Sequence, residues 1–260
     1  QPNLESETPR IKMLSTFEVA LDIKTQEQLE SEFDSGLDPK NLAIWMKHMS
    51  SKPHHVGSPW SKQNAEYAAN KFREWGFDSE IETFDVLVPF PKVRKLSMVA
   101  PERIELKLFE PAVEGDLSSA MTENVLPGYN AFSADGNVTG ELVFVNYGIP
   151  EDYEELKRLG VDVKGKIVIA KYGRSFRGIK PKVAYENGAI GCIMYSDPKD
   201  DGYVVGDVYP EGPYRNEYGI QRGSVLDMPT QPGDALTPGY AATKDAKRLS
   251  KEEAPTIMKI

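Results

Sequence analysis

The tripeptide Pro89-Phe90-Pro91 divides the chain into two parts with different sequence patterns. Before it, apolar residues recur at helical spacing. After it, short β-rich runs alternate with turns rich in Gly, Pro and Asn. Proline lacks a backbone N–H and interrupts both helices and inner strands, so this tripeptide is expected to end the first pattern. The order of patterns predicts an α+β fold, with a helical N-terminal piece followed by a β-rich module.

Two amphipathic helices are predicted before this tripeptide. Asp38 and Pro39 have the residue types of an N-cap and a first helical position. A second helix is predicted between a cap at Ser58 or Ser61 and the stop signal Gly76. The apolar faces of the two helices consist of Leu42, Trp45, Met46 and Met49, and of Ala65, Ala68, Ala69, Phe72 and Trp75. We expect exposed apolar patches on these faces.

The remaining elements are predicted from shorter patterns. A short helix is expected over 25–33 and a strand over 80–88. Residues 196–239 form a loop-rich segment, and a loop of this length tends to carry function. The other predicted elements are strands over 95–99, 104–109, 141–147, 166–172 and 190–195, and helices over 151–159 and 181–187.

Composition excludes several classes of function. The chain has 31 Lys and Arg against 40 Asp and Glu, and this net charge of −9 disfavours a nucleic-acid partner. The longest apolar runs, such as 190–195, are too short to cross a bilayer. A single cysteine excludes an internal disulfide and a thiolate metal cluster. The three histidines lack the spacings of a catalytic zinc site, so no complete hydrolytic site is predicted.

Several local motifs favour plain structural interpretations. A phosphate-binding loop over 160–166 and a calcium-binding hand over 197–208 are rejected, because ligand positions in both hold the wrong residue types. Cys192 lies in an apolar run and is expected to be a buried, inert thiol. Asn137-Val-Thr139 is a glycosylation acceptor only in a secreted eukaryotic protein.

The segment 172–180 holds the compact positive cluster of the chain. Arg174, Arg177 and Lys180 follow a predicted strand, together with Phe176 and two glycines. An Arg presented from such a turn suits a carboxylate, which it can hold with two parallel hydrogen bonds. The equal alternative is a solvated loop in which Arg177 pairs with a local Asp or Glu.

Five motifs together resemble the glutamate carboxypeptidases, a zinc peptidase family also called N-acetylated-alpha-linked acidic dipeptidases. The likeness covers about residues 38–250. The amino-acid sequence of 197–218 resembles bacterial members more closely than animal ones. The motifs occur in the order of the family and consist of residues 165–173 (GKIVIAKYG), 176–178 (FRG), 195–198 (YSDP), 221–223 (QRG) and 236–240 (LTPGY).

The resemblance implies a split architecture. An acidic segment over 1–36 would precede an N-terminal piece of the peptidase domain over 37–88, and residues 89–260 would form an inserted protease-associated (apical) domain. Two zinc ions would be bound by ligands beyond Ile260, so this chain by itself is expected to be inactive. The family also implies a small peptide substrate, the remainder of the peptidase polypeptide as a partner, and a homodimer. We expect a secreted or periplasmic protein, cut within a longer polypeptide at its C-terminal end.

Residue roles follow from the same resemblance. Arg177 would hold the α-carboxylate of the C-terminal residue of the substrate, and Phe176 would line the same pocket. Ser224 replaces an Asn of the mammalian enzyme that also touches this carboxylate, which weakens the expectation of a preference for C-terminal glutamate. Thr237 and Tyr240 match positions whose backbone carbonyls bind a structural calcium.

Two other functions are compatible with the same residues. Transferrin receptors resemble this architecture, lack the metals and act as binding proteins, so the chain is alternatively a non-catalytic recognition module. A free-standing protease-associated domain that binds peptides is a third possibility, which the predicted helices within 38–76 disfavour.

Overall fold

The computed structural model describes residues 23–227 and 233–253, which fall into two compact units divided between Lys52 and Pro53. The first unit contains helices α2 (Ile23–Gly36) and α3 (Pro39–Met49). The side chain of Asp38 accepts a hydrogen bond of 2.9 Å from the backbone N–H of Lys40, and Pro39 begins α3. The predicted cap is therefore confirmed, and the short helix expected over 25–33 is longer at both ends.

Helix α4 (Pro59–Glu74) opens the second unit. The buried Ser58 caps it by accepting a hydrogen bond of 3.2 Å from the backbone N–H of Ser61, which decides between the two predicted caps. Gly76 follows the helix with a φ of +89°, a left-handed conformation that glycine adopts without strain. Phe72 and Trp75 are about half exposed, as predicted for this apolar face.

The strand predicted over 80–88 is absent, which corrects the sequence analysis. This segment is extended, but the structure pairs it with no other strand in the described part of the chain. Its backbone is instead held by side chains, because Leu87 N–H donates to Asp234 (2.7 Å) and Arg248 donates to the Asp85 carbonyl (3.2 Å). An alternating sequence forms a strand only where a neighbour supplies a ladder of hydrogen bonds.

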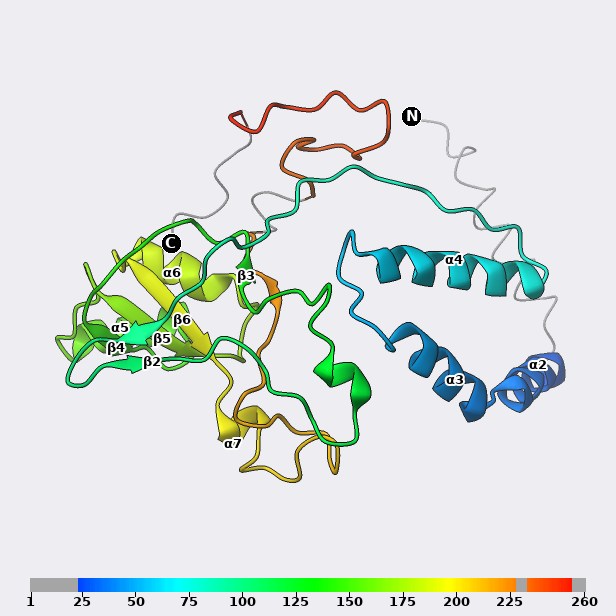
Figure 1. Ribbon diagram of the computed structural model, residues 1–260, viewed down its shortest axis with the longest axis horizontal. Coiled ribbons are helices and arrows are strands. Elements are labelled where there is room, and N and C mark those ends of the chain that lie inside the picture. Colours follow the sequence, from blue (N-terminus) through cyan, green and yellow to red (C-terminus); the bar gives the residue numbers. More distant parts are fainter. Residues whose placement is uncertain (1–22, 228–232, 254–260) are drawn as a thin grey trace, which may run out of the picture. The chain divides into compact units, whose positions relative to one another are not determined.

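The second unit contains a three-stranded parallel sheet (Figure 1). Its order is β4 (Leu142–Phe144), β5 (Ile167–Lys171) and β6 (Gly191–Tyr195). Helix α5 (Pro150–Arg158) connects β4 to β5, and α6 (Ile179–Glu186) connects β5 to β6. These elements confirm five predictions, with shorter strands than expected.

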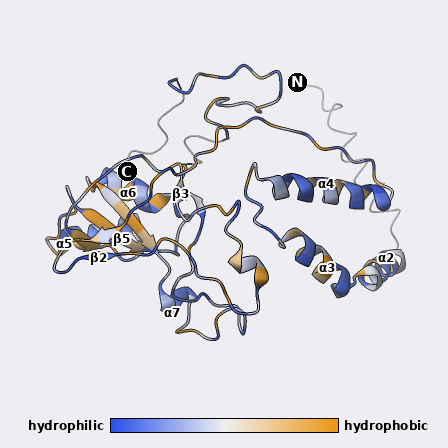
Figure 2. Cartoon of the chain, viewed as in Figure 1, coloured by the Kyte–Doolittle hydropathy of each residue, from blue (hydrophilic) through white to orange (hydrophobic). Residues whose placement is uncertain are grey.

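The core lies between this sheet and its helices. Val168 and Ala170 on the central strand β5 are completely buried, and β5 and β6 are coloured as apolar in Figure 2. The core residues are Val145, Tyr153, Val163, Val168, Ala170, Val183, Ala184 and Ala189. Cys192 packs against them, and burial raises the pKa of its thiol to about 12. A raised pKa favours the protonated thiol at neutral pH, but Cys192 is partly buried and not fully buried as expected.

The other elements of the second unit are short. The antiparallel pair β1 (Ser97–Met98) and β2 (Ile104–Glu105) is all that forms of two longer predicted strands. The parallel pair β3 (Asn130–Ala131) and β7 (Gly223–Ser224) was not predicted, nor were the 3₁₀ helix η2 (Leu117–Ala120) and α7 (Pro198–Asp201). None of the described helices has both the length and the apolar character needed to cross a membrane.

Candidate carboxylate-binding site

The loop between β5 and α6 presents the predicted site residues. Gly173 has a φ of +106° and Arg174 a φ of +59°, so the chain turns sharply where β5 ends. Gly178 then begins α6 in a space that admits no side chain, because a Cβ there would lie 2.8 Å from the Val225 carbonyl oxygen. The loop therefore leads from β5 into α6 within a few residues and holds Phe176 and Arg177 beyond the carboxyl end of β5.

Arg177 is half-buried and bound to neutral acceptors. Its Nε donates to Gln221 Oε1 and its Nη1 donates to the Ser224 carbonyl, each at 3.3 Å. Its guanidinium carbon lies 5.7 Å from the centre of the Phe176 ring. Within residues 23–227 and 233–253, no Asp or Glu forms an ion pair with Arg177. The geometry thus differs from the alternative in which a local acid neutralises this side chain.

Gly223 lies directly against the guanidinium. A Cβ added to Gly223 would be 2.5 Å from Arg177 Cζ and 2.6 Å from its Nη1. The guanidinium therefore packs on bare backbone, and a side chain at position 223 would require it to move. Gly223 is the last residue of the QRG motif (221–223), but nothing in the sequence indicated that this motif contacts Arg177.

Arg177 and Phe176 line an open cavity of about 480 Å³. Arg174 and Gln221 line it too, whereas Ser224 does not. The Ser224 hydroxyl oxygen accepts a hydrogen bond of 3.0 Å from the backbone N–H of Leu226, and the residue reaches Arg177 through its carbonyl. The structure thus brings the three predicted residues together, with Ser224 in contact through its backbone.

Three aspartates that line this cavity are already paired with cations. Asp197 and Asp200 lie 3.4 and 3.7 Å from the ammonium of Lys171, and Asp201 lies 2.6 Å from Arg215. The backbone N–H of Lys199, and then Lys171, lower the pKa of Asp197. These carboxylates are thus paired with Lys171 and Arg215, and not with Arg174 or Arg177 of the same cavity.

Tyr147 is a member of the site that the sequence analysis missed. Its ring lies 4.4 Å from the Lys171 ammonium and 5.0 Å from the Arg174 guanidinium, and its hydroxyl donates to Asp200 at 2.7 Å. The Tyr147 ring therefore makes cation–π contacts with both Lys171 and Arg174. No local pattern distinguished Tyr147 from the other tyrosines of the chain.

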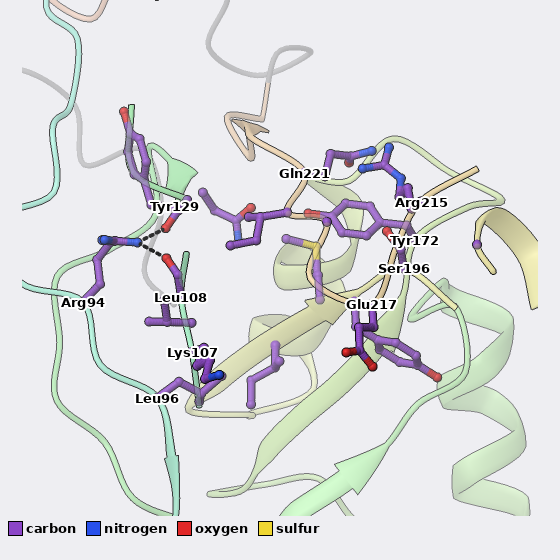
Figure 3. Close-up of a pocket in the computed structure, with 18 of the residues that line it drawn as sticks. Arg94, Leu96, Lys107, Leu108, Tyr129, Tyr172, Ser196, Arg215, Glu217 and Gln221 are labelled. Atoms are coloured by element: carbon purple, nitrogen blue, oxygen red, sulfur yellow. Dashed lines mark hydrogen bonds between the residues drawn. The ribbon is translucent and has the colours of Figure 1, made fainter. Parts of the chain in front are cut away.

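A second cavity, of about 630 Å³, shares a wall with the first. Tyr172, Ser196 and Gln221 line both. Figure 3 shows these residues on one side of the second cavity and Arg94 on the other, where Arg94 donates to the carbonyls of Leu108 (3.0 Å) and Gly128 (2.9 Å). Gln221, which accepts from Arg177, therefore stands between the two cavities.

The predicted calcium positions lie in a turn over 234–240. Thr237 is buried, and its hydroxyl donates to Asp234 at 3.2 Å. Its carbonyl accepts a hydrogen bond of 3.3 Å from the backbone N–H of Tyr240, whose hydroxyl donates to the Lys247 carbonyl. Among the residues that the structure describes, no three His, Cys, Asp or Glu side chains are grouped so that they could hold a metal ion. The described residues therefore do not fit a zinc site.

Comparisons with known proteins agree with this architecture. Residues 138–227 match the PA domain family. The chain is 37% identical over 214 residues to a probable glutamate carboxypeptidase of Arthroderma benhamiae, and the alignment covers 80% of this chain and 29% of that protein. It is 31% identical over 227 residues to a glutamate carboxypeptidase 2 homolog of Caenorhabditis elegans, covering 83% of this chain and 29% of that protein.

A solved structure is also similar to part of the chain. It is an aminopeptidase from Aneurinibacillus sp. strain AM-1, with 21% identity and a TM-score of 0.40 over 72% of this chain and 35% of that one. The chain thus spans less than a third of the length of the two curated relatives described above.

Proposed function

We propose that this chain, which contains a PA domain and fits the glutamate carboxypeptidase-like family through its homologues, is the substrate-recognition part of a zinc-dependent exopeptidase. In this proposal Arg177 binds the free C-terminal carboxylate of a small peptide. The observation that carries it is the Arg177 guanidinium, which lines a cavity and contacts neutral acceptors instead of an acid.

The contacts of Arg177 suit a reversible carboxylate clamp. Gln221 and the Ser224 carbonyl orient the plane of the guanidinium, and Gly223 supports its face. These two hydrogen bonds, each of 3.3 Å, engage Nε and Nη1 and thus use two of the five guanidinium N–H donors. A carboxylate can therefore form two shorter, charge-assisted bonds with the remaining N–H groups. Phe176 contributes the apolar side of the same cavity.

The hydrolytic chemistry is proposed to come from elsewhere in the polypeptide. Bound zinc would supply Lewis-acid activation of water and of the scissile carbonyl. Because the described residues contain no metal-binding cluster, the role of this chain is to bind and orient the peptide. The carbonyls of Thr237 and Tyr240 are proposed calcium ligands, since calcium prefers oxygen donors. Secretion or a periplasmic location, and a homodimer, are further parts of the proposal that follow from the family resemblance.

The test is the substitution Arg177→Ala in the complete polypeptide, with Arg177→Lys as the matched control that keeps the charge. We expect Arg177→Ala to lower kcat/KM for N-acetyl-Ala-Glu about 10- to 100-fold, because a hydrogen bond to a charged group contributes about 1.5–3 kcal/mol. The kcat/KM of Arg177→Lys should lie between those of the parent and of Arg177→Ala, since Lys keeps the charge but lacks the planar fork of Arg. The peptide with a C-terminal amide should be affected much less.

An unchanged kcat/KM and an unchanged ratio of acid to amide would remove Arg177 from carboxylate recognition. Binding of the acid without any hydrolysis by the parent polypeptide would instead favour the non-catalytic recognition module.

A further inference from the structure

A fully buried lysine lies behind the loop that carries Arg177. Lys180, in the first turn of α6, has 0% of its surface exposed. Its Nζ donates to the carbonyl oxygens of Tyr147 at 2.6 Å and Gly173 at 2.9 Å. Burial lowers the pKa of this ammonium, because its hydration is lost and both partners are neutral. Burial of such a group is costly, and its two hydrogen bonds to carbonyl oxygens offset part of that cost.

The two carbonyl groups belong to the two turns that form one side of the cavity. Tyr147 follows β4, between Asn146 and Gly148, which have φ values of +50° and +63°. Gly173 begins the loop after β5, and Arg174 after it is also left-handed. Left-handed non-glycine residues such as Asn146 and Arg174 are strained and persist only where the surroundings hold them. Lys180 supplies such a constraint to both turns at once.

The position of Arg177 depends on this backbone. Its own two hydrogen bonds are long, so they do not determine where the loop lies. The Lys180 bond to Gly173 is shorter and fixes the start of the loop. The bond to Tyr147 fixes the residue whose ring contacts Lys171 and Arg174.

We propose that Lys180 is a positioning residue for carboxylate recognition. It ties the turn after β4 to the loop after β5 and thereby places the Arg177 guanidinium at the cavity. The inference rests on the proposed function of Arg177 and adds to it a residue that cannot touch the substrate. Loss of this link displaces the clamp without removing it.

The test replaces Lys180 by Met, which is similar in size and lacks the ammonium, in the complete polypeptide. The control is Lys157→Met, which removes an exposed lysine of α5. The protein is treated with 1,10-phenanthroline, which removes zinc and leaves calcium in place, so that the peptide is not consumed, and N-acetyl-Ala-Glu is titrated by calorimetry. We expect Lys180→Met to raise Kd by about 10- to 100-fold, since a misplacement of about 1 Å can have such an effect. Lys157→Met should bind like the parent.

Two further measurements separate positioning from general structural damage. The C-terminal amide of the peptide should bind the variant and the parent equally, because it makes little use of the clamp. Hydrogen–deuterium exchange should become faster over residues 171–178 and stay unchanged in α5. A folded Lys180→Met variant that binds the acid within about twofold of the parent overturns the proposal.

A second variant decides the case in which Lys180→Met does not fold. Gly173→Ala disturbs the other end of the same link, because its Cβ would lie 3.3 Å from the Tyr147 ring at a left-handed φ. A raised Kd for the acid alone supports the proposal, and unchanged binding overturns it. If neither variant folds, the link serves stability, and the positioning role is also overturned. If instead Arg177 does not bind the carboxylate, the Arg177→Ala variant keeps the preference of the parent for the peptide acid over its C-terminal amide. The two proposals can therefore fail separately.

Discussion

At the residue scale, the candidate site depends on the uncharged neighbours of the Arg177 guanidinium. The Arg177 guanidinium is useful because its neighbours are an amide, a carbonyl and a glycine. The three aspartates that line the same cavity are held by Lys171 and Arg215. Each of these aspartates has a cationic partner other than Arg177, so the Arg177 guanidinium keeps neutral neighbours in an acidic chain.

Gly223→Ala tests the packing of this guanidinium. The new methyl group would lie 2.5 Å from Arg177 Cζ, so the flexible end of the Arg side chain must move. We expect a loss of preference for the free acid over the amide with little change in Tm, measured by steady-state kinetics and thermal unfolding. Gly219→Ala is the matched control, because its Cβ would meet Arg215 at an ordinary 3.5 Å. An unchanged acid preference in Gly223→Ala would contradict the packing argument.

At the element scale, helix ends and strand partners follow different rules. The caps of α3 and α4 are local, since each needs only one side chain near its own helix. A strand needs a second segment, which is distant along the chain for every pair in this fold except β1 and β2. The cap of α3 and the two candidate caps of α4 could therefore be predicted from one segment, whereas the strand over 80–88 failed because it has no partner in the described part of the chain.

Ser58→Ala tests the cap of α4. The substitution removes the acceptor of the Ser61 N–H at a buried position. We expect the free energy of unfolding to fall by about 1 kcal/mol, measured with chemical denaturant. Ser61→Ala keeps the Ser58 hydroxyl as acceptor and should change the free energy of unfolding by less than about 0.5 kcal/mol. Equal effects of the two substitutions would show that the cap has no special role.

At the scale of the whole molecule, each unit leaves apolar side chains in water. In the first unit, Leu42 and Met46 are 59% and 68% exposed on α3, and in the second Phe72 is 48% exposed on α4. Exposed apolar faces of this kind mark surfaces that another part of a protein covers. We propose that the remainder of the polypeptide covers them.

A hydrophobic dye can test this exposure. The 260-residue chain should bind ANS, and the triple variant Leu42→Ser, Met46→Ser and Phe72→Ser should bind less, as measured by fluorescence at equal concentrations. Leu117→Ser is the control, because it removes one exposed side chain of η2. Equal dye binding by the triple variant and the parent would show that these faces are not the exposed apolar surface.

The sequence by itself was sufficient for features whose cause is local. The Asp38-Pro39 start of α3, the Gly76 stop after α4 and the apolar run of β6 each follow from the residues of one segment. The motifs around Phe176 and Arg177 also indicated the family and the loop that presents the site.

Tertiary structure alone decided which distant residues meet that loop. It placed Gly223 against the guanidinium, turned the Ser224 carbonyl toward it, and buried Lys180 between two carbonyl groups. It also left residues 80–88 without a strand partner. These outcomes depend on contacts between segments far apart in the chain, and such contacts leave no periodic trace in the sequence of either segment.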